Sequence, residues 1–381
     1  MAIYLDNAAT SFPKPETVYQ AMDHYMRKVG TNAGRGSYRR ALQADQMLFE
    51  TRLRLAQLFN AGDASRIVFT ANATEAINLA IKGYVSPGDH VIASGMEHNA
   101  SWRTLRTLEA RGIISLSLLP HEVNGTVDLD RAKDLFTPCT RLVVSSHVSN
   151  VTGGILPISE LGRICRSRGV VFLVDSAQSA GILPIDVEAM GISLLAFTGH
   201  KGLLGPQGTG GLYISEDIEL RPLKEEGTGS ESAREFQPNS LPDRYEAGTL
   251  NVPGLIGLGA ALEYIVQEGL ESIAAREREL LNYARHQLAQ IPGIMLYGPA
   301  DPGEQIGVLS FRFPRISPEE IAGRLDGDYG IMVRAGLHCA PQAHRTIGTI
   351  DTGTVRIGLG HFNTEDDVDQ LLRGLEAIAK S

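Results

Sequence analysis

The sequence contains few cysteines, only three among its 381 residues. Cys139, Cys165 and Cys339 are odd in number, lie far apart and form no Cys-x-x-Cys pair. A disulfide framework and a cysteine-based zinc site are therefore not expected, and no other metal site is predicted.

The chain also lacks a block of like charge, a long apolar run and a signal-like start. Its formal net charge of −9 argues against nucleic acid or an anionic membrane as the main partner. No run approaches the roughly 18 apolar residues of a membrane-spanning helix. The opening MAIYLDNAATSF has neither a basic region nor an apolar core of the secretory type. We therefore expect a cytoplasmic protein.

Between about residues 66 and 216, short apolar runs alternate with stretches of helical character. The runs are RIVFT, HVIAS, IISLSL, RLVVSSHV, VVFLVDSA, LLAFTG and GGLYIS. Apolar strands separated by helices of about ten residues are typical of a parallel sheet covered on both faces. The pattern predicts a large α/β domain with a mostly parallel, seven-stranded sheet.

The alternation of apolar strands and helices ends after this region. Residues 217–251 read as a long polar loop, a length that in compact domains is usually functional or mobile. A long helical region is predicted at 254–291, and GVLSFRFP and TVRIGLG predict strands of a second, smaller sheet. A last helix is predicted at about 364–379.

These features predict two unequal domains. We place the large domain at residues 15–261. A smaller α+β domain would comprise 262–381 together with the N-terminal segment 1–14.

The segment 170–201 carries the clearest chemical pattern. One apolar strand delivers Asp175 at its end, and the next ends in Thr198-Gly199-His200-Lys201. Ligands bind beyond the carboxyl ends of strands in such sheets. A strand-end Asp alone is more often a helix cap, and a loop Lys alone is more often solvated. Together they favour a buried amine that forms an imine and a carboxylate that keeps a pyridine nitrogen protonated.

At this point the sequence resembles the class V aminotransferase family, which uses pyridoxal 5′-phosphate (PLP), and within it the group II cysteine desulfurases. The matching segments occur in family order from one end of the chain to the other. They are YLDNAAT (4–10), NATEAIN (72–78), MEHNA (96–100), SNVTGG (149–154), VDSAQS (174–179), TGHK (198–201), YEAGTLN (245–251), RAGLHCA (334–340) and RIGLGHFNT (356–364). The resemblance implies PLP fold type I and a homodimer.

The resemblance implies the residues that hold the PLP ring. Lys201 would bind the cofactor as a Schiff base and shuttle the Cα proton of the substrate. Asp175 would pair with the pyridine nitrogen, and Gln178 would hydrogen-bond the phenolic oxygen. His98 would stack on the ring and take part in proton transfer.

The resemblance also implies a phosphate site at the helix start around Ala73 and Thr74, where free N–H groups favour an anion. Related sequences often have a hydroxyl residue where Ala73 stands, so this contact would come from the backbone alone. Thr198 and His200 would add hydrogen bonds. Thr249 would reach the phosphate of the neighbouring subunit.

For the substrate, the resemblance implies that Arg356 binds the carboxylate through a bidentate pair. Asn150 would lie beside it, and we assign Asn7 and Arg334 to the same substrate site. The polar segment 224–244 matches no related form closely, so its role in substrate access and partner docking stays open.

Cys339 in RAGLHCA separates sulfur transfer from other PLP reactions. Its thiolate would take the sulfur of L-cysteine as a persulfide and leave alanine, with His338 or Arg334 as a neighbouring cation that activates it. The short connection from Cys339 to Arg356 is similar to that of group II enzymes. The protein would then pass sulfur to an acceptor protein, as in iron–sulfur cluster assembly.

Other functions stay open. A selenocysteine lyase or a cysteine-sulfinate desulfinase depends less on the thiol. A PLP transaminase or epimerase needs no thiol, and a scaffold without catalysis would not need Lys201, Asp175 and Arg356.

Overall fold

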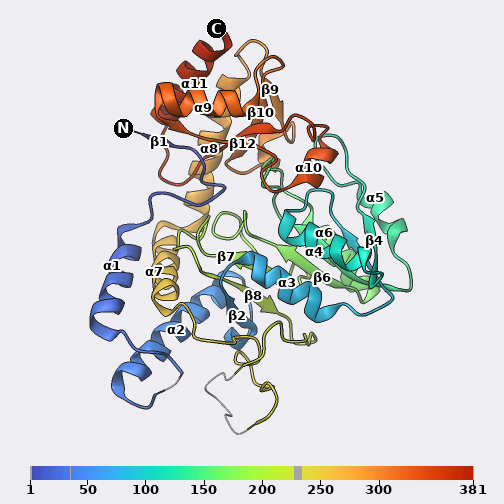
Figure 1. The fold of residues 1–381 in the computed structure, drawn as a ribbon, viewed down its shortest axis with the longest axis vertical. Coiled ribbons are helices and arrows are strands. Elements are labelled where there is room, and N and C mark those ends of the chain that lie inside the picture. The colour runs from blue at the N-terminus through green and yellow to red at the C-terminus, as the bar shows by residue number, and fades with distance from the viewer. Residues whose placement is uncertain (1, 35, 227–233, 381) are drawn as a thin grey trace.

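The computed structural model describes residues 2–34, 36–226 and 234–380 of the chain. Its centre is a seven-stranded sheet with the order β2-β8-β7-β6-β5-β3-β4, in which β8 runs antiparallel to its two neighbours (Figure 1). The strands are β2 (Ile67–Thr70), β3 (Asp89–Ala93), β4 (Ile114–Leu118), β5 (Thr140–Ser146), β6 (Val171–Asp175), β7 (Leu194–Thr198) and β8 (Gly210–Ile214). The predicted mostly parallel, seven-stranded sheet is confirmed.

The sheet is buried on both faces, which explains why its strands read as continuous apolar runs. Along β7, Leu195 and Phe197 belong to one apolar core, and Leu194 and Ala196 belong to the other. Successive side chains of a strand point to opposite faces, so one five-residue run supplies both cores.

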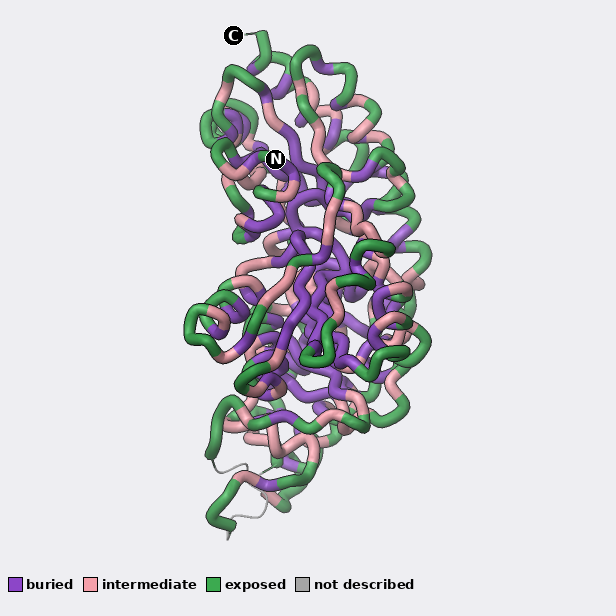
Figure 2. Tube along the Cα trace, turned by 90° about the vertical axis from the view of Figure 1, so that its right-hand side faces the viewer, coloured by how far each residue is buried: buried purple, intermediate pink, exposed green. Residues whose placement is uncertain are grey.

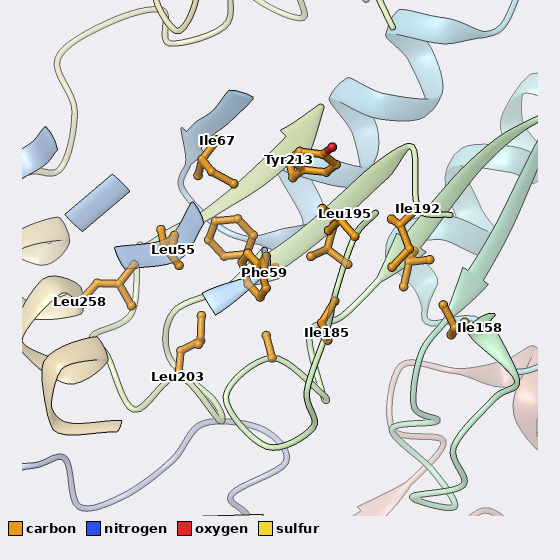
Figure 3. Close-up of a cluster of buried hydrophobic side chains, with 14 of the residues drawn as sticks. Leu55, Phe59, Ile67, Ile158, Ile185, Ile192, Leu195, Leu203, Tyr213 and Leu258 are labelled. Atoms are coloured by element: carbon orange, nitrogen blue, oxygen red, sulfur yellow. The ribbon is translucent and has the colours of Figure 1, made fainter. Parts of the chain in front are cut away.

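Helices cover the two faces. One core draws on α3 and α4, and the other on α2, α6 and α7. Between α2, β2 and α7, Leu55, Ile67 and Leu258 surround Phe59, whose ring lies 5.2 Å from that of Phe197 between centroids (Figure 3). The helices of this part are α1 (Glu16–His24), α2 (Arg39–Leu58), α3 (Ala73–Tyr84), α4 (Asn99–Ala110), α5 (Leu129–Ala132), α6 (Ile158–Arg168) and α7 (Val252–Glu268), and a π-helical turn (Tyr25–Val29) follows α1.

A smaller antiparallel sheet, with the order β12-β13-β10-β9, lies apart from the large sheet, in the upper part of the molecule in Figure 1. Its strands are β9 (Met295–Tyr297), β10 (Val308–Arg312), β12 (Arg334–Gly336) and β13 (Thr354–Gly358). The helices beyond α7 are α8 (Leu270–Leu288), α9 (Pro318–Tyr329), α10 (Pro341–Thr346) and α11 (Glu365–Lys380). Apolar residues from α8, α9 and α11 pack with this sheet into a separate core, and in Figure 2 the buried trace runs through the middle of both parts.

The N-terminal segment joins the smaller part. β1 (Ile3–Tyr4) pairs in parallel with β11 (Ile331–Met332), and the N–H of Leu5 continues the contact by donating to the carbonyl of Met332. The division into 15–261 and 262–381 with 1–14 stays a prediction, which this pairing supports.

Two differences from the sequence analysis concern segments after the large sheet. The helical region predicted at 254–291 is two helices, because Gly269 between them has a φ of +82°, a conformation that favours glycine. The polar segment 224–244 falls partly on residues 227–233, which lie outside the described residues. Across the described part of the chain, no helix combines the length and apolar composition needed to cross a membrane.

Candidate active site

Most of the predicted site residues meet beyond the carboxyl ends of the parallel strands. β6 ends at Asp175, β7 ends at Thr198, and the turn after β7 carries Lys201. They line a cavity of about 210 Å³. The predicted residues on its wall are Ala73, Thr74, His98, Asn150, Asp175, Gln178, Thr198, His200, Lys201, Arg334 and Arg356.

Lys201, which is half-buried, and Asp175, which is buried, both line this cavity. Burial lowers the pKa of the Lys201 amine to about 8, although the negative charge of Asp175 opposes the shift. Burial also raises the pKa of the Asp175 carboxyl, while the N–H of Ala177, which donates to it over 2.9 Å, acts in the opposite direction. The amine is therefore partly unprotonated near neutral pH and able to act as a nucleophile.

His98 and Gln178 approach the cavity from two different turns. His98 caps α4, and its Nδ1 accepts a hydrogen bond from the N–H of Ala100 over 3.1 Å. Burial, with the charge of Lys201 as a second cause, lowers the pKa of His98 to about 4, so its imidazole is neutral at physiological pH. Gln178 donates to the carbonyl of Ala8 over 3.0 Å, which fixes its amide at the cavity wall.

The predicted anion site lies at the start of α3. The side chain of Asn72 caps the helix by accepting from the N–H of Glu75, which leaves the N–H groups of Ala73 and Thr74 without partners inside the helix. His200 faces the same cavity, and its Nδ1 is buried without a hydrogen bond. Thr198, in contrast, donates to the carbonyl of Thr209 over 3.3 Å.

Arg356 is almost completely buried, with 1% of its surface exposed. Its guanidinium donates to a carboxylate oxygen of Asp6 over 2.7 Å and to the carbonyl of Asn150 over 2.9 Å. Its Nε has no hydrogen bond, and neither does Oδ1 of Asn150. Arg356 Nε is therefore a donor, and Asn150 Oδ1 an acceptor, without a hydrogen bond in the described structure, and both residues line the same cavity as Lys201.

Cys339 lies on a short turn between β12 and α10. Two consecutive residues of this turn, His338 and Cys339, have φ angles of +48° and +58°. These left-handed conformations are costly for residues other than glycine, and such strain is found most often at functional sites. The carbonyl of Cys339 accepts from the N–H of Asn99, and the carbonyl of His338 accepts from Asn150 over 2.7 Å. The turn is thus held against the cavity wall.

The Cys339 thiol is exposed and lies beside the cavity, which is lined by its neighbours His338 and Arg334. The guanidinium of Arg334 donates to Sγ over 3.1 Å. His338 is not the second cation that its residue type suggested: burial lowers the pKa of its imidazole to about 2, and its Nε2 pairs with Thr354. Arg334 is the charged group that contacts the thiol directly, and the guanidinium of Arg356 lies close enough to interact with it electrostatically.

Thr249 and Asn7 do not line this cavity. Thr249 lines a surface depression of about 240 Å³ together with Phe49 and Glu246. Asn7 donates to the carbonyl of Gly358 and to Asn363, and it lines a small neighbouring pocket of about 30 Å³ together with Gln178 and Lys201.

The sequence analysis did not assign three residues that the structure brings to the site. Asp6 pairs with Arg356, Asn72 caps α3, and Ser146 lines the cavity at the end of β5. The LDNAAT and NATEAIN segments contain Asp6 and Asn72, but only the fold shows which groups they contact. Ser146 follows an apolar strand in the same way as Asp175, and that was its available signal.

In the described part of the chain, the remaining thiols and acidic groups form no metal site. Cys165 is buried, which raises its pKa to about 12, and Cys139 is exposed. Among the described residues, no group of three or more His, Cys, Asp or Glu side chains is arranged to hold a metal ion.

Known proteins resemble this chain over its whole length. The aminotransferase class-V family matches residues 3–371. A probable cysteine desulfurase of Methanothermobacter thermautotrophicus is 38% identical, with coverage of 99% of this chain and 94% of the relative. A cysteine desulfurase of Escherichia coli O127:H6 is 37% identical, with coverage of 98% and 93%. The apo structure of a cysteine desulfurase from Thermococcus onnurineus NA1 superposes with a TM-score of 0.92 at 34% identity, and covers 100% of this chain and 95% of its own.

Proposed function

Because the chain belongs to the aminotransferase class-V family and resembles cysteine desulfurases along its whole length, we propose that it converts L-cysteine to L-alanine with the aid of PLP. The sulfur is held as a persulfide on Cys339. The observation that carries this proposal is the exposed thiol of Cys339, paired with Arg334 at the wall of a cavity that contains Lys201 and Asp175.

The buried groups of the cavity fit PLP. Asp175 is a buried carboxylate suited to a pyridinium nitrogen, and Lys201 is an amine with a lowered pKa suited to an aldehyde carbon. The start of α3 at Ala73 and Thr74 suits a dianionic phosphate. His98 and Gln178 would border the ring.

When bound, PLP withdraws electrons from Cα of the amino acid and so makes its proton removable. Lys201 Nζ then takes that proton and returns one to the substrate carbon. Arg356 holds the substrate carboxylate through its unpaired Nε, and the amide nitrogen of Asn150, which has one N–H beyond its bond to His338, lies beside it. Neutral His98 closes one side of the site against water.

The sulfur transfer is carried by Cys339. Its thiolate attacks the sulfur of the substrate, so that an S–S bond forms while the C–S bond breaks. The electron pair of the broken bond remains on the carbon, which takes a proton to give alanine. The thiolate sulfur is oxidised as the carbon is reduced, so no external oxidant is needed.

Sulfur leaves the enzyme by transfer to an acceptor. The exposure of Cys339 at the surface supports an acceptor protein that meets the persulfide directly. Iron–sulfur cluster assembly is the pathway that we propose this transfer supplies.

A homodimer completes the proposal. Leu42, Phe49 and Leu53 are large apolar residues exposed on α2, at the spacing that places them on one side of a helix. Phe49 borders the same depression as Thr249. A second copy of the chain on this face would cover the apolar side chains and bring Thr249 to the partner's phosphate.

The test compares wild type with Cys339→Ala on cysteine, selenocysteine and a keto acid, with alanine and amino-acid products measured. Wild type should form alanine from cysteine and carry one extra, reductant-sensitive sulfur on the peptide that contains Cys339. Cys339→Ala should retain PLP and lose alanine formation by on the order of 10³-fold or more.

Other products would replace this assignment. Undiminished activity of Cys339→Ala on cysteine would make the residue structural. Cleavage of selenocysteine or cysteine sulfinate alone would indicate a lyase, and amino transfer to the keto acid would indicate a transaminase.

A further inference from the structure

Glu97 is a completely buried carboxyl group directly behind the cavity, with 0% of its surface exposed. It precedes His98 in the turn that follows β3. One of its oxygens, Oε1, accepts two hydrogen bonds, from the hydroxyl of Ser94 over 2.6 Å and from the N–H of Ser146 over 2.5 Å. The other oxygen, Oε2, is buried and makes no hydrogen bond of good geometry within the described part of the chain, although the carboxyl also interacts with the buried hydroxyl of Ser101.

These contacts connect the turn after β3 to the end of β5, which lies beside the end of β6. Ser146 is the last residue of β5, and it lies opposite Asp175 in the register of β5 with β6. Ser146 also lines the cavity. Glu97 therefore joins the turn that carries His98 to the edge of the sheet that carries Asp175, although its own side chain does not line the cavity.

We propose that Glu97 is a positioning residue, which holds the turn of His98 to the strand end that carries Asp175 and does so most stably as an uncharged carboxylic acid. This inference rests on the proposed PLP function. It adds a residue that acts through its neighbours and does not touch the substrate.

The surroundings of Glu97 disfavour a negative charge. Burial is the main cause that raises its pKa to about 7. The hydrogen bond from Ser94 opposes this shift, the charge of Asp175 adds to it, and hydrogen bonds from Ser146 and Ser101 oppose it more weakly. The adjacent imidazoles of His98 and His147 supply no compensating cation, because burial lowers the pKa of each to about 4. An unpaired, charged oxygen at this depth is costly, and protonation removes that cost.

Replacing Glu97 by glutamine distinguishes the positioning role of the side chain from its uncharged state. Glu97→Gln keeps an oxygen acceptor for Ser94 and Ser146 but is never charged, whereas Glu97→Ala removes the link. The matched control is Glu277→Ala, since Glu277 on α8 is also a buried glutamate with an unpaired oxygen but does not line this cavity.

The first measurement is the visible absorption of the PLP-loaded proteins as a function of pH. Glu97→Gln should retain the wild-type midpoint between the absorbing forms. Glu97→Ala should shift it by about one pH unit and weaken PLP binding roughly 10-fold. Glu277→Ala should lose stability without either change.

Two outcomes overturn the proposal in this measurement. If Glu97→Ala behaves like Glu277→Ala, the residue is merely structural. If Glu97→Gln shifts the midpoint as much as Glu97→Ala, the charge of Glu97 matters and the carboxyl is ionised.

The second measurement uses the proteins without PLP and is independent of the proposed function. A folded-state pKa raised above the ordinary value means that wild type loses stability as pH rises from about 4.5 to about 7. The melting temperature of Glu97→Gln should therefore rise relative to wild type between pH 5 and pH 8. A constant difference would overturn the uncharged state, whereas absence of PLP binding by wild type would refute the proposed function instead.

Discussion

The guanidinium of Arg334 donates a hydrogen bond to Sγ of Cys339 over 3.1 Å. Arg334 is the first residue of β12, and Cys339 lies in the short turn that follows this strand. This contact pairs a cation with the atom that we propose accepts sulfur. The neighbouring His338 is neutral, so it adds no positive charge beside the thiol.

Arg334 should control the reactivity of Cys339. Arg334→Gln should slow alkylation of Cys339 by a neutral reagent at pH 7 roughly 10-fold, because an adjacent cation favours the reactive thiolate. Arg334→Lys should retain part of the rate. Peptide mass spectrometry measures both, with the exposed Cys139 as an internal control whose rate stays constant. Equal loss at the two cysteines would contradict the assignment.

Asp175 should be required for proton removal but not for cofactor binding. Asp175→Ala should still bind PLP and should exchange the α-hydrogen of alanine for deuterium at least about 10²-fold more slowly, because the pyridinium loses its counter-ion. NMR in D₂O measures the exchange. Asp186→Asn, which alters a carboxylate bonded to Asn60 outside the cavity, should exchange at the wild-type rate. A fast Asp175→Ala variant would refute the role.

Lys201 should make the stability of the PLP-free protein depend on alkaline pH. Its folded-state pKa of about 8 lies below the ordinary value of 10.5, so the unfolded chain binds more protons between these values and stability rises with pH. Wild type should gain up to about 3 kcal/mol relative to Lys201→Met between pH 8 and pH 10.5. Urea unfolding at several pH values measures the gain. The exposed Lys28→Met should show none of this dependence relative to wild type, and a flat difference for Lys201→Met would disprove the shift.

Phe49 should be needed for the proposed dimer. Its side chain is 53% exposed on α2, and a charge there would be buried by a second copy of the chain. Phe49→Asp should therefore run as a monomer in light scattering with unchanged helical circular dichroism. Val123→Asp, on another exposed apolar residue, should remain dimeric. A dimeric Phe49→Asp protein would place the interface elsewhere.

The large sheet could be predicted because its signal is local. Strands such as Val171–Asp175 are buried on both faces, so every residue is apolar up to the polar end. The same runs ended at Asp175 and near Lys201, which is why these two residues of the site were found. The helix Arg39–Leu58, although it is long, was not predicted, because large apolar residues such as Leu42 and Phe49 are exposed and blur its amphipathic pattern.

Contacts between distant segments could not be predicted. Asp6 and Arg356 lie at opposite ends of the sequence, and nothing local indicates that they form an ion pair over 2.7 Å. The charge state of His338 follows from burial, which residue type does not reveal. Asn7 was assigned to the substrate because it stands in a matching segment, and nothing local indicates that its amide also donates to the distant carbonyl of Gly358.

The pairing of β1 with β11, and of Asp6 with Arg356, has a consequence for folding during synthesis on the ribosome. The first residues to leave the exit tunnel have partners that are among the last to be made. The large sheet, complete by Ile214, has all its strands long before then. Domains generally fold as units during synthesis, so Asp6 receives its partner Arg356 only when the chain is nearly finished. An incomplete nascent chain can thus fold its sheet and still have no competent substrate site.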